Sequence, residues 1–180
     1  MAEDVAGMTR AERKDALRTH DTEGIPLTTG QRLPYFRLIS DAGRSVRLSD
    51  FRGCRNVVVA FCNAADGAAS RSLLTGLAER YAEFVQDNAE ILAVIHGSVE
   101  SAERVRRSAN LPFPVLADED GRVHRVVGVA MATGVGEPAV YVADRYGEIF
   151  YAHGTAVGQS PPATAELLGW VRFIELQCPD

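Results

Sequence analysis

This sequence of 180 residues lacks the features that nucleic-acid-binding proteins, membrane proteins and exported proteins require. It carries 19 Lys and Arg against 24 Asp and Glu, a net charge of -5, so it has no broad electrostatic attraction for nucleic acid or for an anionic membrane. No apolar run approaches the roughly 20 residues that span a bilayer, and the N-terminal stretch has no apolar signal core. We therefore expect a cytoplasmic protein that binds neither nucleic acid nor membrane.

Cysteine and histidine are also sparse. The three cysteines, Cys54, Cys62 and Cys178, have no CxxC spacing and an odd count, so reduced thiols are expected instead of a disulfide framework or a zinc site. The four histidines are scattered without the spacing of metal ligands. They are His20, His96, His124 and His153. We expect surface or hydrogen-bonded histidines, no metal and no cofactor.

The length fits one domain with a substantial core, preceded by a different first segment. Residues 1–30 are charged and poor in apolar side chains, which is typical of an appendage. Within them Thr9 and Glu12 form a capping box, which predicts a helix to about Arg18. That helix either packs on a partner subunit or lies, frayed, on the domain's own surface. Residues 31–180 are expected to form the folded domain.

Strand and helix patterns alternate through that domain. Two short strands, Tyr35–Ile39 and Ser45–Leu48, flank a turn and predict a hairpin, and Ser49 offers an N-cap for a helical turn that Gly53 ends. Val57–Phe61 is a continuous apolar strand expected to be buried on both faces. The elements predicted after it are a helix through Leu73, Leu74, Leu77, Tyr81 and Phe84, a strand at 91–95, a helix at 98–110, a strand near 115, a helix at 122–127, a hairpin at 139–152 and a helix at about 162–176. Such an order predicts an α/β fold, a mixed sheet flanked by helices.

The stretch from Asn56 to Phe84 carries a family resemblance. In peroxiredoxins of the AhpC/TSA type the strand ends in an aromatic residue and the following loop reads Pro-x-x-x-Thr-x-x-Cys, which aligns without gaps on Asn63, Gly67 and Ser70. The phrases LSDFRG, LPFPVLADEDGRV and YVADRYGEI are typical of the same family in the same order. The chain thus resembles peroxiredoxins from about residue 30 to residue 168, and the resemblance implies a thioredoxin-like fold.

The resemblance also identifies the chemistry that is missing. A peroxidatic cysteine attacks peroxide as a thiolate and passes through a sulfenic acid, whereas the Ser70 hydroxyl is un-ionised near neutral pH and has no comparable oxidation state. Members of the family also carry a hydroxyl at the position of Gly67 and an arginine at the position of Pro138, and this chain has neither. Thioredoxins carry a cis-proline at the position of Pro138, so the Glu137–Pro138 bond is a candidate cis bond.

Two other nucleophilic roles are open to this region. Ser70 would need a base and an oxyanion hole to act as a hydrolase nucleophile, and no histidine has a recognisable relation to it, so a first-turn or capping serine is the simpler interpretation. Cys62, which follows the central strand, is the one plausible redox thiol, with Cys178 as a possible resolving partner. The plainer alternative is that Cys62 is a small buried apolar residue.

Four residues outline a candidate binding site at the former active-site loop: Asn63, Asp66, Gly67 and Pro138. A helix N-terminus there favours an anion or a polar ligand, unless Asp66 itself caps the free amides. We expect a binding or regulatory protein, with a small polar ligand or protein partner and a possible homodimer. The alternative function is a divergent thiol-dependent oxidoreductase or peroxidase that uses Cys62.

Overall fold

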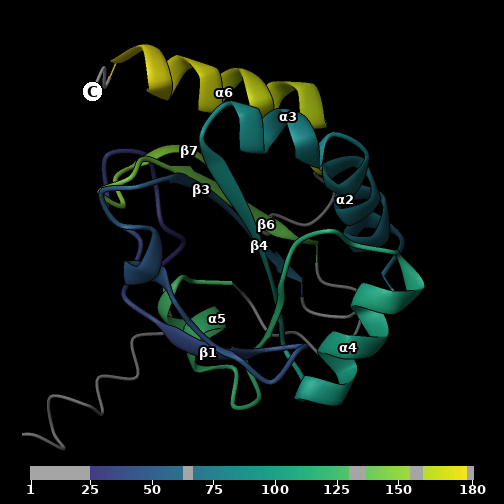
Figure 1. Ribbon diagram of the computed structural model, residues 1–180. Coiled ribbons are helices and arrows are strands. Elements are labelled where there is room, and N and C mark those ends of the chain that lie inside the picture. Colours follow the sequence, from purple (N-terminus) through teal and green to yellow (C-terminus); the bar gives the residue numbers. More distant parts are fainter. Residues whose placement is uncertain (1–24, 63–66, 130–136, 155–159, 178–180) are drawn as a thin grey trace, which may run out of the picture.

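A seven-stranded mixed sheet forms the centre of the protein in a computed structural model, which describes residues 25–62, 67–129, 137–154 and 160–177 (Figure 1). The strands lie in the order β2-β1-β5-β4-β3-β6-β7. Their bounds are β1 Arg37–Ser40, β2 Ser45–Arg47, β3 Asn56–Cys62, β4 Ala89–Ile95, β5 Val115–Ala117, β6 Ala139–Ala143 and β7 Ile149–His153. The helices are η1 Leu48–Phe51, α2 Ala68–Glu79, α3 Tyr81–Gln86, α4 Val99–Ser108, α5 Arg122–Val126 and α6 Thr164–Gln177.

The central strand β3 is buried at every position, as its uninterrupted apolar run predicts. It pairs in parallel with β4, where Cys62 lies opposite Ile95, and antiparallel with β6, where Phe61 lies opposite Ala139. β4 pairs in parallel with β5. The carboxyl ends of β3, β4 and β5 and the start of β6 therefore meet at one edge of the sheet.

Alternate side chains of β3 enter two separate cores. Val58, Ala60 and Cys62 pack with α2, α3, α4 and α6, whereas Val57, Val59 and Phe61 pack with η1, α5 and the segment before β1. In Figure 1 helices α6, α3, α2 and α4 follow one another around the upper and right sides of the sheet, and α5 lies with β1 below and to the left. This division places Cys62 on the side of α2 and Phe61 on the side of α5.

Both predicted hairpins are present, but two helix predictions need correction. The predicted long helix is two helices, because Arg80 between α2 and α3 has φ -113° and ψ 14°. No proline or glycine marks this break. The guanidinium of Arg80 binds Glu83 at 2.7 Å, and beyond the break Tyr81 packs on the ring of Phe113 at 5.7 Å between centroids. The apolar residues of both helices stay in phase, so the spacing could not reveal the junction.

The short helix η1 starts one residue before the predicted cap. Its N-cap is Arg47, not Ser49, and the backbone N–H of Arg47 donates to Asp50 Oδ2 at 2.9 Å. Asp50 thus supplies the terminal hydrogen bond that we expected from the serine. Gly53 ends this region as predicted, with φ +72°, a conformation that favours glycine.

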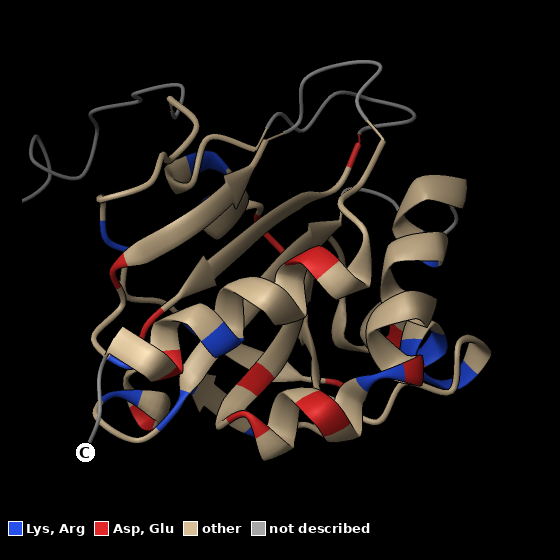
Figure 2. Ribbon diagram, turned by 90° about the horizontal axis from the view of Figure 1, so that it is seen from above, with Lys and Arg blue, Asp and Glu red and all other residues tan. Residues whose placement is uncertain are grey.

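The predicted N-terminal helix lies outside the described residues. From residue 25 onward the chain packs on the domain, since Leu27 N–H donates to Val127 O and Gly30 N–H donates to Ile149 O. Figure 2 shows acidic and basic positions interspersed over the described elements, in line with surface ion pairs such as Arg80–Glu83 and Arg172–Asp87. No helix in the described part is long and apolar enough to cross a bilayer.

Candidate functional site

The candidate site lies where β3 ends and α2 begins. Gly67 is the N-cap residue of α2, with φ -64° and ψ 132°, and Ser70 is the third residue of the helix. Ser70 shares the buried face of α2 with Leu73, Leu74 and Leu77, the helical spacing that directs its side chain into the core. It is 1% exposed, and Ser70 Oγ has no hydrogen-bond partner in the described part of the chain. Ser70 is thus a first-turn serine whose hydroxyl is buried and has no partner among the described residues.

Cys62 is the last residue of β3 and is completely buried. Burial raises the pKa of its thiol to about 11, and the neighbouring Ser70 hydroxyl lowers the pKa only in part. Ser70 Oγ makes no hydrogen bond of ordinary geometry within the described ranges, so burial is the larger influence on this thiol. Cys62 is therefore a protonated thiol at neutral pH, in keeping with its interpretation as a small core residue.

Pro138 precedes β6 at the same edge of the sheet. Ala139 pairs with Phe61 in antiparallel register, so the buried Pro138, one residue earlier in the chain, lies level with Cys62. The described residues contain no cis peptide bond, so Glu137–Pro138 is trans, unlike the cis bond that we considered. The structure thus brings Cys62, Ser70 and Pro138 to one end of the sheet. Asn63, Asp66 and Cys178 lie outside the described residues.

A buried acid–imidazole pair at this edge was missed by the sequence interpretation. Asp118, which follows β5, is 1% exposed, and His124 on α5 is fully buried. The Asp118 carboxylate accepts hydrogen bonds from His124 Nδ1 at 2.7 Å, His124 N at 2.9 Å and Val123 N at 3.3 Å. Burial alone would raise the pKa of Asp118, but the hydrogen bonds from His124 and Val123 outweigh it and lower the pKa.

The surroundings of His124 connect it with the carboxyl end of β3. Its ring stands edge-on to Phe61 at 5.3 Å between centroids and lies 5.9 Å from the ring of His96. His124 Nε2 is buried and has no hydrogen-bond partner among the described residues. The spacing of Asp118 and His124 around an Asp-Gly turn was the available signal, since an acid just before a short helix is placed to bind its first amides.

Metal ligands are not gathered here. The described ranges hold no group of three or more His, Cys, Asp or Glu side chains arranged to bind a metal ion. His96 is exposed and His124 is hydrogen-bonded, as predicted for the histidines, whereas His153 Nε2 is buried without a hydrogen-bond partner among the described residues. The chemistry available at this edge consists of a hydroxyl, a protonated thiol and an imidazole held by a carboxylate.

A mixed sheet with helices on both faces, whose central parallel strand leads into a helix, defines an α/β thioredoxin-like protein. Residues 29–152, more than half of the chain, match the model of the AhpC/TSA family. The chain belongs to this family. Gly67, Ser70 in the first turn of α2 and the buried Cys62 are to be interpreted within it.

Relatives of this chain are named peroxiredoxins. It is 29% identical over 129 residues to peroxiredoxin Q, chloroplastic, of Oryza sativa subsp. japonica, covering 71% of this chain and 59% of the relative. It is 32% identical over 103 residues to peroxiredoxin Q, chloroplastic, of Sedum lineare, covering 57% of this chain and 55% of the relative. The chain therefore spans less than two thirds of the length of these two proteins.

Solved structures share the fold at lower identity. Peroxidoxin BcpB from Mycobacterium tuberculosis matches with a TM-score of 0.72 at 20% identity, over 82% of this chain and 98% of that one. A mutant PrxQ from Xylella fastidiosa matches with a TM-score of 0.73 at 19% identity, over 83% and 98%. At this level of identity the likeness supports the thioredoxin-like fold alone.

Proposed function

We propose that this protein uses the peroxiredoxin scaffold for binding or regulation and does not reduce peroxide by a thiol. The observation that carries the proposal is the pair Ser70 and Cys62. The first stands at the peroxidatic position without a thiol, and the second is a thiol that is fully buried with a pKa of about 11.

The pKa of Cys62 determines how much reactive thiolate is present at neutral pH. A thiol with a pKa of about 11 is ionised at pH 7 in about one molecule in ten thousand, whereas an activated cysteine of pKa below 7 is mostly thiolate. The completely buried sulfur is also shielded from a peroxide in solution. A Cys62-dependent oxidoreductase would need a rearrangement that both exposes and acidifies this thiol.

In this proposal the edge of the sheet at the carboxyl end of β3 binds a ligand or a partner. The first amides of α2 and the half-buried Gly67 lie where the chain passes from β3 to this helix, and the buried Pro138 lies level with Cys62 at the end of β3. Helix N-termini favour anionic or polar groups. We propose a small polar ligand or a protein partner, including a second copy of the chain, as the occupant of this edge. Asn63 and Asp66 belong to this proposal as candidate contacts.

The test is peptide mass spectrometry on reduced full-length protein exposed briefly to near-stoichiometric hydrogen peroxide, with peroxide consumption followed in parallel. We expect slow oxidation at the rate of ordinary free cysteines, with exposed Cys54 modified before Cys62. A Cys62→Ser variant is the control and should consume peroxide at the same rate. Rapid formation of a Cys62 sulfenate or disulfide, lost in the control, would establish the oxidoreductase alternative and overturn the proposal.

A further inference from the structure

A small cavity lies at the other end of the sheet from Ser70 and Cys62. Three segments line it: residues 32–35 before β1, η1 with the turn after it, and the β6–β7 turn at 144–147. Val57, near the start of β3, belongs to its wall, and Cys62 ends the same strand. Five residues of strand separate the two ends by about 17 Å. The cavity is therefore a separate feature from the site described above.

The inner wall of the cavity is apolar. Leu33, Leu48 and Val57 contribute to it and are each at most 7% exposed, and Phe51 lies beside them. The cavity volume is about 60 Å³. At roughly 10–15 Å³ for each water-sized group, this is room for about four such groups, the size of a branched alkyl chain of four carbons.

The outer wall carries four guanidinium groups, from Arg32, Arg52, Arg55 and Arg145. Arg55 pairs with Glu90 at 3.3 Å and Arg145 pairs with Glu175 at 3.1 Å, so acids outside the cavity lining balance these two.

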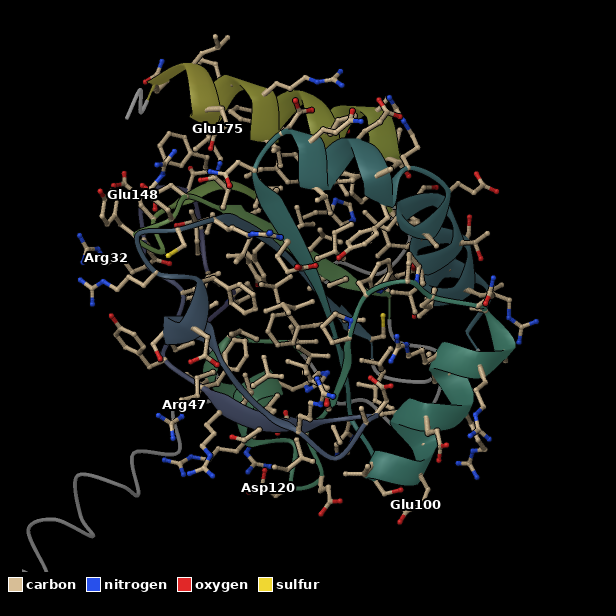
Figure 3. All side chains as sticks on the ribbon, viewed as in Figure 1. Arg32, Arg47, Glu100, Asp120, Glu148 and Glu175 are labelled. Carbon is tan, nitrogen blue, oxygen red and sulfur yellow. The ribbon has the colours of Figure 1, made fainter. Side chains whose placement is uncertain are left out.

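The other two arginines are not balanced in this way. Among the described residues no ion pair involves Arg32 or Arg52, although both are exposed. Arg52 donates to Tyr35 Oη and lies over that ring at 6.0 Å from its centroid, which fixes its position beside the cavity. Arg32 projects from the side of the molecule that carries η1 (Figure 3).

One acid lines the cavity and offsets part of this positive charge. Asp144 is the acid that lines it, and its Oδ1 accepts the backbone N–H groups of Tyr146 and Glu148 at 2.9 and 2.8 Å. Glu148 forms a backbone bridge with Arg32, but its exposed side chain is outside the lining. Since Arg55 and Arg145 pair with acids outside the lining, Arg32 and Arg52 together outweigh Asp144, and an excess of positive charge flanks an apolar cavity on a chain whose net charge is -5.

We propose that this cavity binds a small branched aliphatic carboxylate, with the alkyl group inside and the carboxylate between Arg32 and Arg52. The planar guanidinium group matches a carboxylate with paired hydrogen bonds, and two such groups would hold it from different segments of the chain. The apolar wall supplies the remaining affinity by burying methyl and methylene groups. This binding activity is independent of the redox state of Cys62 and of the occupant of the Ser70 edge.

The proposal is tested by titrating the full-length protein with isovalerate and following amide shifts by NMR. Isovalerate should bind saturably, with shifts concentrated on the cavity segments. Acetate, which lacks three carbons, should bind tens of times more weakly, because each buried methylene contributes about four-fold. Isoamyl alcohol, which lacks the charge, should bind at least about ten-fold more weakly.

Variants of the two arginines test whether isovalerate binds at this cavity. Arg32→Gln and Arg52→Gln should each weaken isovalerate binding by about five-fold or more, and the doubly substituted protein should show no saturable binding. Arg104→Gln is the control, because Arg104 is exposed on α4, outside the cavity lining, and donates to Ser101 Oγ at 2.8 Å.

Equal responses to acetate and isovalerate, unchanged affinity in both arginine variants, or no saturable shift would each overturn the proposal. None of these results would alter the outcome of the peroxide experiment, so failure of this site and failure of the proposed function are distinguishable.

Discussion

Substitution of Asp118 by Asn tests whether the buried acid–imidazole pair holds the carboxyl edge of the sheet together. The carboxylate accepts three hydrogen bonds, from His124 Nδ1, His124 N and Val123 N, and both side chains are at most 1% exposed. Asparagine keeps one acceptor oxygen but turns an NH₂ group toward donors. Hydrogen bonds to charged groups contribute about 1.5–3 kcal/mol each, and breaking a buried pair costs about 3–5 kcal/mol. We expect a loss of about 3 kcal/mol in the free energy of unfolding.

Urea denaturation followed by the fluorescence of Trp170, the single tryptophan, measures this loss. For a domain of this length each kcal/mol corresponds to about 2–4 °C, so Tm should fall by about 6–12 °C. Asp120→Asn is the matched control, because the exposed side chain of Asp120 accepts one hydrogen bond within the described residues, from the N–H of Arg122 at 3.0 Å, and the variant should lose less than about 1 kcal/mol.

The lowered pKa of Asp118 predicts how the stability lost in Asp118→Asn changes with pH. The pKa of Asp118 is lower in the folded protein than in the unfolded chain, where an aspartate titrates near 3.9. Its stabilisation is therefore complete above about pH 5 and is lost as the pH falls through the folded pKa. The difference between the native protein and Asp118→Asn should shrink from pH 5 downward. A loss below about 1 kcal/mol at pH 7, or a difference that does not change with pH, would refute the reasoning.

Two further predictions concern thiol access and helix packing. Iodoacetamide should label exposed Cys54 in the native protein at least about 100-fold faster than Cys62, whose pKa is about 11, and urea should abolish the difference; equal native rates, read by peptide mass spectrometry, would contradict the buried position of Cys62. Gly76→Ala should destabilise the protein by about 1–3 kcal/mol, because the added Cβ would lie 2.5 Å from Thr164 Oγ1 where α2 meets α6. Gly169→Ala, which meets no atom within 4 Å in α6, should stabilise it by up to about 1 kcal/mol in the same denaturation assay.

Much of the fold was predictable because its signals are local. The apolar run of β3 and the turn residues of both hairpins each specify their own conformation. The break at Arg80 was not predictable, since no residue there strongly disfavours helix, and the packing of Tyr81 on Phe113 just beyond it is a tertiary contact. Tertiary contacts outweigh local propensity at such a junction.

The candidate site likewise has one part that the sequence predicts and one part that depends on tertiary structure. The position of Ser70 and the absence of its thiol follow from the loop sequence, whereas the pairing of Asp118 with His124 depends on how β5 turns into α5. The cavity with Arg32 and Arg52 was still less accessible, because segments more than 100 residues apart in the chain form it.

The structure also explains why the family fold does not depend on a thiol at Ser70. The sheet and both cores consist of strands and helices whose buried faces are apolar, and Ser70 meets this core only at the first turn of α2. A buried hydroxyl without a partner costs about 1–3 kcal/mol, a small loss against the burial of every side chain of β3. The fold therefore does not depend on a thiol at Ser70. In our proposal the helix N-terminus at one end of the sheet and the arginine-flanked cavity at the other carry binding functions.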